Sequence, residues 1–488
     1  MTMKPLFPCG RSRREFVWQM GGGFAGLALS SLLSQDGFSF SGATAAETTG
    51  RSANPLAARP PQLPARAKSC IFLMMNGAPS QVDTFDYKPA LKKYSGKSLP
   101  ADKEYINSGG RKVGYLTPEW RPFRAGGESG LMISDYFPRV REHADKLCVI
   151  NSCYTDSHAH GSALVAMNTG KTLIGRPTLG SWCVYGLGTE NDSLPGYVVI
   201  LDKRGGPISG QPNWSSGFMP ATYSGTLFRP VGQPILDLQG PANISPAMQR
   251  EQLSLLEQLN AKHLESRPGD QELAARIKSY ELAYRMQSAT PESVDLGQED
   301  ERTLSMYGVG KKPTDEFGRN CLIARRLVER GVRFVQLYSG GGHLEETWDA
   351  HAGIESNHGQ HAPEVDQPIS ALLTDLEQRG LLDEMLVVWG GEFGRMPFSE
   401  GKDAPGRNHN PYGFSMWMAG GGVRGGITYG KTDELGFEAA TDRVHISDLH
   451  ATILYLMGLD HEMLTYFHQG REETLTDVRG RVVREVMA

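Results

Sequence analysis

Six short apolar segments, separated by helical patterns, constrain the fold of this chain more than any other feature. They cover residues 70–75, 146–151, 197–201, 332–338, 385–389 and 414–419. Strands with near-continuous hydrophobicity are typical of a sheet whose two faces are both covered. Helical patterns at 316–330, 364–379 and 447–457 alternate with them. We therefore predict an α/β fold, with a mostly parallel central sheet and helices on both faces.

Two segments depart from this alternation. Residues 244–290 carry apolar side chains at helical spacing on two successive lines, including Leu256, Leu259, Ile277 and Tyr280. This spacing predicts a two-helix insertion in a domain that spans 68–488. Residues 205–243 are rich in Gly, Pro and Ser. A loop of that length is usually functional, so we expect it to lie over a site.

The first residues have the pattern of an export signal. Ser12, Arg13 and Arg14 open a twin-arginine motif, SRREFV, and an apolar stretch follows at 20–33. Small residues at 43–45 suit a signal peptidase, so we predict a signal over 1–45 and a linker over 46–67. The alternative is a short membrane anchor, but a span needs about 20 apolar residues. We expect a periplasmic or extracellular protein, exported by the twin-arginine machinery, with no stable membrane span after processing.

Cysteine content and charge exclude other classes. Beyond Cys9 there are five cysteines, an odd number that argues against a complete disulfide framework. Cys148 and Cys153 could pair, or all five could be small buried side chains, which we favour. The net charge is −5 with both signs mixed along the chain, so nucleic acid is not an expected partner.

Ligand-type side chains gather just after the predicted strands. Ligands bind beyond the carboxyl ends of the strands in open parallel sheets. The candidate metal ligands there are Asp83, His158, Asp349, His351, Glu392 and His409. Mixed carboxylate and imidazole ligands suit a divalent ion such as Zn²⁺, Mn²⁺ or Fe²⁺. Arg395 could hold an anionic oxygen with two hydrogen bonds. Each residue also has a simpler reading, as a helix cap or a solvated loop side chain.

Several motifs in this chain resemble one known family. WGGEFGR at 389–395, GRNHNP at 406–411 and MAGGGVRGGITYGKTDE at 418–434 are similar to segments of the DUF1501 family, as is MNGAPSQVDTFDYKPAL at 75–91. The likeness covers most of 68–470. Members are exported proteins of planctomycete-type bacteria, grouped with the alkaline phosphatase and sulfatase superfamily. The resemblance therefore implies an alkaline-phosphatase-like fold and a metal-dependent hydrolase.

The resemblance also assigns roles to particular positions. AMNTG at 166–170 is similar to the end of the superfamily's nucleophile helix, which places His160 near the nucleophile, with Ser162 beside it. Asn76 stands where the superfamily has an aspartate ligand. Glu392 and Phe393 stand where it has an Asp-His pair, so one ligand is changed and one is lost. The sulfatase signature Cys-x-Pro/Ala-x-Arg is absent, which argues against a formylglycine mechanism.

Two functions are compatible with these residues. The first is an exported metal-dependent hydrolase of a sulfate or phosphate ester, acting on a small anionic ester or a sulfated polysaccharide. His160 or Ser162 would be the nucleophile or general base, with Arg395 on the anion. The second is a divergent, non-catalytic envelope or polysaccharide-binding protein of the same fold, which the changes at Asn76 and Phe393 favour.

Overall fold

A computed structural model describes residues 54–98, 114–229, 232–236, 238, 243–265, 271–342, 344–401 and 404–488. Residues Ala53–Ala488 form one compact unit. The predicted signal at 1–45 lies outside the described residues, and export therefore stays a prediction. Within the described parts of the chain, we find no helix that combines the length and the apolar character needed to cross a membrane.

The centre of the molecule is a nine-stranded sheet, ordered β12-β4-β11-β8-β1-β7-β5-β6, with β15 also paired to β4. Its strands are β1 (Ser69–Met75), β4 (Cys148–Tyr154), β5 (Tyr197–Ile200), β6 (Thr226–Phe228), β7 (Phe334–Ser339), β8 (Met385–Gly390), β11 (Phe414–Ala419), β12 (Ile427–Tyr429) and β15 (Val444–His445). Only β11 runs against its neighbours, β8 and β4; the other pairings are parallel. All six predicted strands are confirmed.

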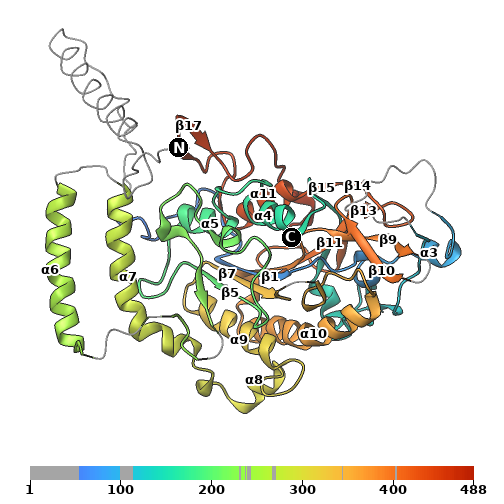
Figure 1. Cartoon of the computed structure of the whole chain (residues 1–488), viewed down its shortest axis with the longest axis horizontal. Helices are drawn as coiled ribbons and strands as arrows, with labels where there is room; N and C mark the ends of the chain where they lie inside the picture. The colour runs from blue at the N-terminus through green and yellow to red at the C-terminus, as the bar shows by residue number, and fades with distance from the viewer. Residues whose placement is uncertain are drawn as a thin grey trace, which may run out of the picture. The chain divides into compact units, whose positions relative to one another are not determined.

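Both faces of the sheet are covered, as predicted (Figure 1). Alternate residues of β1 enter different cores: Cys70, Phe72 and Met74 belong to one, and Ile71, Leu73 and Met75 to the other. The first core is closed by α4 (His160–Thr169), α5 (Leu179–Leu187) and α11 (Ile446–Leu456). The second is closed by α9 (Asp315–Glu329), α10 (Ile354–Gln378) and the 3₁₀ helix η2 (Val140–Lys146). Burial on both faces explains why the strands are mostly apolar.

Helix α10 begins ten residues before the predicted start at 364. Its first turns contain His358 and His361, which precede the predicted helix in the sequence. Both imidazoles are fully buried and pack against Trp348. Tertiary burial therefore extends the helix beyond the part whose apolar spacing is visible.

The insertion consists of α6 (Pro246–Glu265) and α7 (Gln271–Val294), two long helices drawn beside the sheet in Figure 1. The part of the predicted linker that is described, 54–67, lies along the domain: Leu56 is buried, and the amides of Leu63 and Arg66 donate to Gly458 and Leu456. The five cysteines after Cys9 are free and buried, as we favoured.

The remaining elements are short. They are α2 (Gln81–Thr84), α3 (Ala90–Lys93), β2 (Phe123–Gly126), β3 (Leu131–Ser134), η3 (Gln211–Trp214), η4 (Ala221–Tyr223), η5 (Leu296–Gln298), α8 (Glu301–Met306), η6 (Leu344–Glu346), η7 (Leu382–Glu384), β9 (Gly394–Gly401), β10 (Ala404–Asn410), β13 (Lys431–Thr432), β14 (Ala439–Thr441), β16 (Tyr466–His468), β17 (Arg471–Glu473) and η8 (Arg484–Val486). The antiparallel hairpin β9–β10 follows β8 directly, and it carries residues toward the carboxyl ends of the parallel strands.

Candidate metal centre

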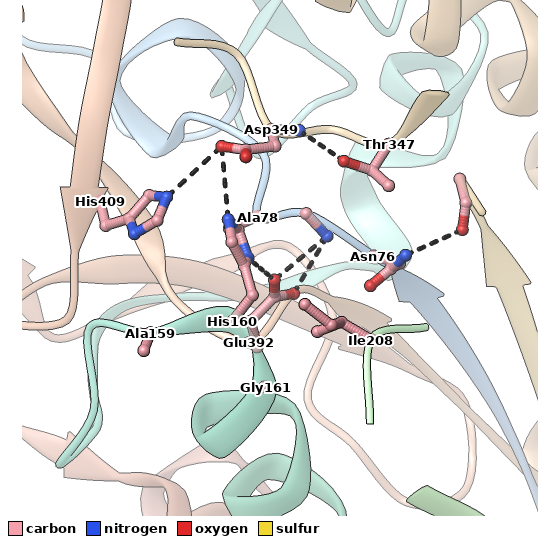
Figure 2. A network of polar contacts seen from close by, with 12 residues as sticks. Asn76, Ala78, Ala159, His160, Gly161, Ile208, Thr347, Asp349, Glu392 and His409 are labelled. Atoms are coloured by element: carbon pink, nitrogen blue, oxygen red, sulfur yellow. Dashed lines mark hydrogen bonds and ion pairs between the residues drawn. The ribbon is translucent and has the colours of Figure 1, made fainter. Parts of the chain in front are cut away.

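Four side chains from separate parts of the sequence meet at the carboxyl edge of the sheet, and Figure 2 shows three of them, His160, Asp349 and His409. His160 opens α4, after β4. Asp349 and His351 lie between β7 and α10, and His409 lies on β10. One ligand atom from each of these side chains lies within 4.8 Å of every other. Because β11 is antiparallel, the segment before it, which includes His409, reaches the same edge as the ends of β4, β7 and β8.

The distances among these atoms match a metal-binding geometry. Asp349 Oδ1 lies 3.0 Å from His351 Nε2, 3.3 Å from His160 Nε2 and 3.4 Å from His409 Nε2. The two Nε2 atoms of His351 and His409 are 2.8 Å apart. A tetrahedral ion with bonds of about 2.0–2.1 Å separates its ligand atoms by about 3.3 Å. The cluster is therefore close to the spacing that such an ion requires.

Two of the histidines are held by their other ring nitrogen. His160 Nδ1 lies 2.5 Å from Glu392 Oε1, and His409 Nδ1 lies 2.7 Å from the carbonyl oxygen of His158. Both partners are acceptors, so each Nδ1 carries a proton, and the Nε2 atom that faces the cluster is the one that would bind a metal in the neutral ring. Carboxylates and carbonyls behind metal-binding histidines fix the ring orientation in the same way.

Glu392 is itself held in place by the loop after β1. The amide of Gly77 donates to its two carboxylate oxygens, at 3.1 and 3.3 Å. Gly77 has φ +104°, and a Cβ there would lie 2.6–2.7 Å from Thr347 Oγ1 and from the backbone nitrogens of Trp348 and Asp349. Only glycine therefore lets this loop approach the Asp349 segment so closely.

Arg395 lies behind Asp349 rather than in the open site. Its guanidinium contacts Asp349 Oδ1 at 2.7 Å and is fully buried. Burial by itself would raise the pKa of Asp349. The charge of Arg395 and the contacts with His160, His351 and His409 outweigh burial and lower that pKa far below its usual value. Asp349 is therefore a permanent carboxylate at the centre of the cluster.

The histidines respond differently to the same surroundings. Burial lowers the pKa of His160, but hydrogen bonds to Asp349 and Glu392 outweigh it and raise the pKa overall. Burial is also the largest effect on His409, whose pKa falls to about 3. His409 is therefore neutral at ordinary pH, the form that binds a metal.

Three predicted ligands lie outside this group of four. Asp83 is fully buried against Arg407, whose Nε lies 2.8 Å from its Oδ2. A carboxylate paired in this way is structural. Glu392 contacts His160 through the far nitrogen instead of joining the four ligand atoms. The loop before α4 contributes the backbone carbonyl of His158 to the site, through His409.

The predicted catalytic residues have mixed outcomes. His160 is in the cluster. Ser162 lies in the first turn of α4, where its hydroxyl is 2.7 Å from that of Ser157. The anion-binding role predicted for Arg395 does not fit its contacts, because its N–H groups donate to Asp349 and to the carbonyls of Gly77, Ala78 and Arg407. A clamp on substrate requires N–H groups that point at the substrate.

The two positions where the resemblance implied lost ligands have structural roles here. The Asn76 amide donates to the carbonyl of Gly340, at 3.1 Å. Phe393 is buried, with its ring centre 4.8 Å from that of His160 and 4.7 Å from that of His409. It therefore forms an apolar wall behind both imidazoles.

Two small cavities adjoin Asp349. One, of about 150 Å³, is lined by Asn76, Gly77, His160, Ile208, Gly342, Leu344, Thr347 and Asp349. The other, of about 250 Å³, is lined by Asp349, Ala350, Ala352, Gly353, Ser356, Asn357 and Gln360. Ile208 lies beside His160 in Figure 2. It belongs to the 205–243 segment, which was expected to lie over a site. Sequence reasoning did not single out Ile208, Leu344 or Gly77.

Comparison with known proteins adds the family. No curated protein matches the sequence. Similar solved structures include the lipoteichoic acid synthase LtaP from Listeria monocytogenes, with 10% identity over 86% of this chain and 78% of that chain and a TM-score of 0.38. PsFucS1 sulfatase from a Pseudoalteromonas species has 12% identity over 82% and 69%, with a TM-score of 0.33. Alkaline phosphatase from the Antarctic bacterium TAB5 has 12% identity over 82% and 100%, with a TM-score of 0.31.

At these scores, the likenesses say nothing about what this chain binds or catalyses. The sequence comparison is more direct. The model of one family, described as a protein of unknown function (DUF1501), matches residues 67–487. That range contains every residue of the cluster and nearly all of the compact unit, and the chain therefore belongs to the DUF1501 family.

Proposed function

We propose that this protein is a metal-dependent hydrolase of phosphate or sulfate monoesters. The observation that carries the proposal is the convergence of His160, Asp349, His351 and His409 on one point beside a small cavity. A structural ion is usually enclosed by its ligands, whereas a catalytic ion keeps an open position. Here two cavities reach Asp349 from outside, which favours a reactive site.

The chain's own residues would divide the work as follows. His351, His409, Asp349 and His160 would hold the ion, and Glu392 would keep the Nε2 atom of His160 directed at it. A bound divalent ion would supply Lewis-acid stabilisation of the anionic oxygens of the ester. The alcohol portion would lie between Ile208 and Leu344, in the cavity of about 150 Å³. That cavity suits a small alcohol group better than a long chain.

The proposal has a direct test. Purified protein is loaded with zinc or manganese, analysed for bound metal, and assayed with aryl phosphate and aryl sulfate esters. We expect metal-dependent turnover that disappears in His351→Ala. His263→Ala, on the exposed side of α6, is the matched control and should behave as wild type. Failure of the folded wild-type protein to retain any divalent metal would refute the proposal.

Export is a second part of this proposal. SRREFV at 12–17 and the apolar stretch at 20–33 support transport by the twin-arginine route, and a periplasmic or extracellular location. Cell fractionation of the wild-type chain and of a variant with Arg13 and Arg14 changed to Lys tests this. Retention of the wild-type chain in the cytoplasm would contradict it.

A non-catalytic relative remains a second candidate, and one observation favours it. The Ser162 hydroxyl bonds to Ser157, and the N–H groups of Arg395 donate to protein groups. The predicted nucleophile Ser162 and the predicted anion clamp Arg395 are therefore both engaged with protein groups. A protein that binds metal and a sulfated or phosphorylated ligand, yet hydrolyses no ester, would match this alternative.

A further inference from the structure

We infer that the site takes one divalent ion, and that the buried guanidinium of Arg395 supplies a second, permanent positive charge beside it. This inference rests on the proposed metal site and specifies its stoichiometry. Its basis is the way in which positive and negative groups are paired around Asp349.

Asp349 is contacted by one guanidinium and three imidazoles, and all four contacts are to its Oδ1 atom. Its Oδ1 atom lies 2.7 Å from Arg395 Nη2, a shorter distance than to any of the three histidine nitrogens. A second ion that shared this oxygen would lie against the guanidinium. In Figure 2, Asp349 lies above His160, with His409 to one side.

Arg395 cannot turn away to admit a second ion. Its Nε donates to the carbonyl of Ala78 at 2.9 Å, its Nη1 to that of Arg407 at 3.3 Å, and its Nη2 also to that of Gly77. The side chain has no exposed surface. Four hydrogen bonds in a buried setting fix the planar group in one orientation.

The neighbouring carboxylates are also committed. Glu392 bonds to His160 Nδ1 and to the Gly77 amide, and Asp83 is paired with Arg407. Like charges repel strongly in a buried setting, and a second divalent ion beside Arg395 would have no uncommitted carboxylate among these groups to offset that repulsion. The described residues therefore provide one set of metal ligands.

The first measurement is metal content of the full chain after saturation with zinc and removal of loosely bound ions. We expect one zinc per chain. Two zinc ions per chain would overturn this inference while leaving the proposed function intact. No zinc would overturn both.

The second measurement tests the role of Arg395 by thermal unfolding with and without zinc. Arg395→Met leaves the Asp349 charge buried and unneutralised in the metal-free protein, so zinc should stabilise this variant more than wild type. We expect the zinc-induced rise in Tm to be larger than in wild type, by on the order of 2 °C or more. Equal rises would overturn the inference.

Two further variants separate the loss of the Arg395 charge from general destabilisation. Arg395→Lys retains the charge, so its zinc-induced rise should resemble that of wild type even if its hydrogen bonds are poorer. Arg407→Met removes the other buried guanidinium, which neutralises Asp83 outside the cluster. It should lower Tm without enlarging the effect of zinc. An enlarged effect in Arg407→Met as well would mean that general destabilisation, and not the charge beside Asp349, is responsible, and would overturn the inference.

Discussion

The orientation of His160 by Glu392 leads to a quantitative prediction about metal affinity. Glu392 is completely buried, and it accepts hydrogen bonds from His160 Nδ1 at 2.5 Å and from the Gly77 amide at 3.1 Å, both on Oε1. Glu392→Gln can keep an oxygen in this place but loses the negative charge. Glu392→Ala loses both the charge and the acceptor.

The expected sizes follow from these contacts. Residues behind a metal ligand typically change metal affinity by about 10–100-fold when mutated. We expect about tenfold weaker zinc binding in Glu392→Gln, which is about 1.4 kcal/mol. We expect about 100-fold weaker zinc binding in Glu392→Ala, because His160 is then free to rotate and to take the other tautomer.

Competition with a chromophoric chelator at pH 7.5 measures zinc affinity independently of turnover. Circular dichroism of each metal-free variant shows whether the fold is retained. We expect zinc affinity to fall in the order wild type, Glu392→Gln, Glu392→Ala. If both folded variants bound zinc as tightly as wild type, Glu392 would not be orienting a ligand, and the assignment of His160 to the metal centre would fail with it.

Three further predictions concern the surroundings of the cluster. Gly77→Ala should lose most bound zinc, because the added Cβ would meet the Asp349 segment at 2.6–2.7 Å. Gly96→Ala is the control, since Gly96 also has a positive φ but nothing lies within 4 Å of its added Cβ. Equal zinc contents in the two variants would contradict the prediction. Asp83→Asn should lose about 3–5 kcal/mol of unfolding free energy in urea while keeping wild-type zinc content, since its partner is Arg407; loss of zinc from folded protein would restore Asp83 as a ligand. Burial lowers the pKa of His450 to about 4, so the unfolded chain binds the proton first as pH falls below about 6.5, and stability should drop by about 2 kcal/mol by pH 5. His450→Gln should reduce that drop, and an unchanged pH dependence would count against a neutral, buried His450.

The fold was predictable because burial on both faces leaves a simple trace in the sequence. Segments such as 70–75 and 385–389 are apolar at every position, and their pairing in the sheet is parallel, as expected for strands separated by helices. The early start of α10 was not predictable in this way. His358 and His361 are buried by contact with Trp348, which lies outside the helix. The spacing of apolar residues along a helix cannot indicate a contact with a residue elsewhere in the chain.

The site was predictable in position but not in the role of each residue. The rule that ligands lie at the carboxyl ends of parallel strands gave Asp349, His351 and His409 as ligands, whereas His160 entered as a candidate nucleophile through the family resemblance. It cannot distinguish a ligand from a residue that holds a ligand. Glu392 and His160 are 232 positions apart, so nothing in local spacing indicates that one supports the other. The same limit applies to Asp83, whose partner Arg407 lies 324 positions away.

The two buried arginines show what an arginine near a candidate site can mean. Arg395 and Arg407 lie on the adjacent strands β9 and β10, each beside one buried carboxylate, Asp349 or Asp83. Arg395 also donates to the carbonyl of Arg407. An isolated buried carboxylate is costly, and each guanidinium offsets that cost as an ion-pair partner. Asp349 differs from Asp83 because histidines share its Oδ1 atom and a cavity reaches it. The hairpin thus supports one structural ion pair and one carboxylate that is kept ionised for a metal.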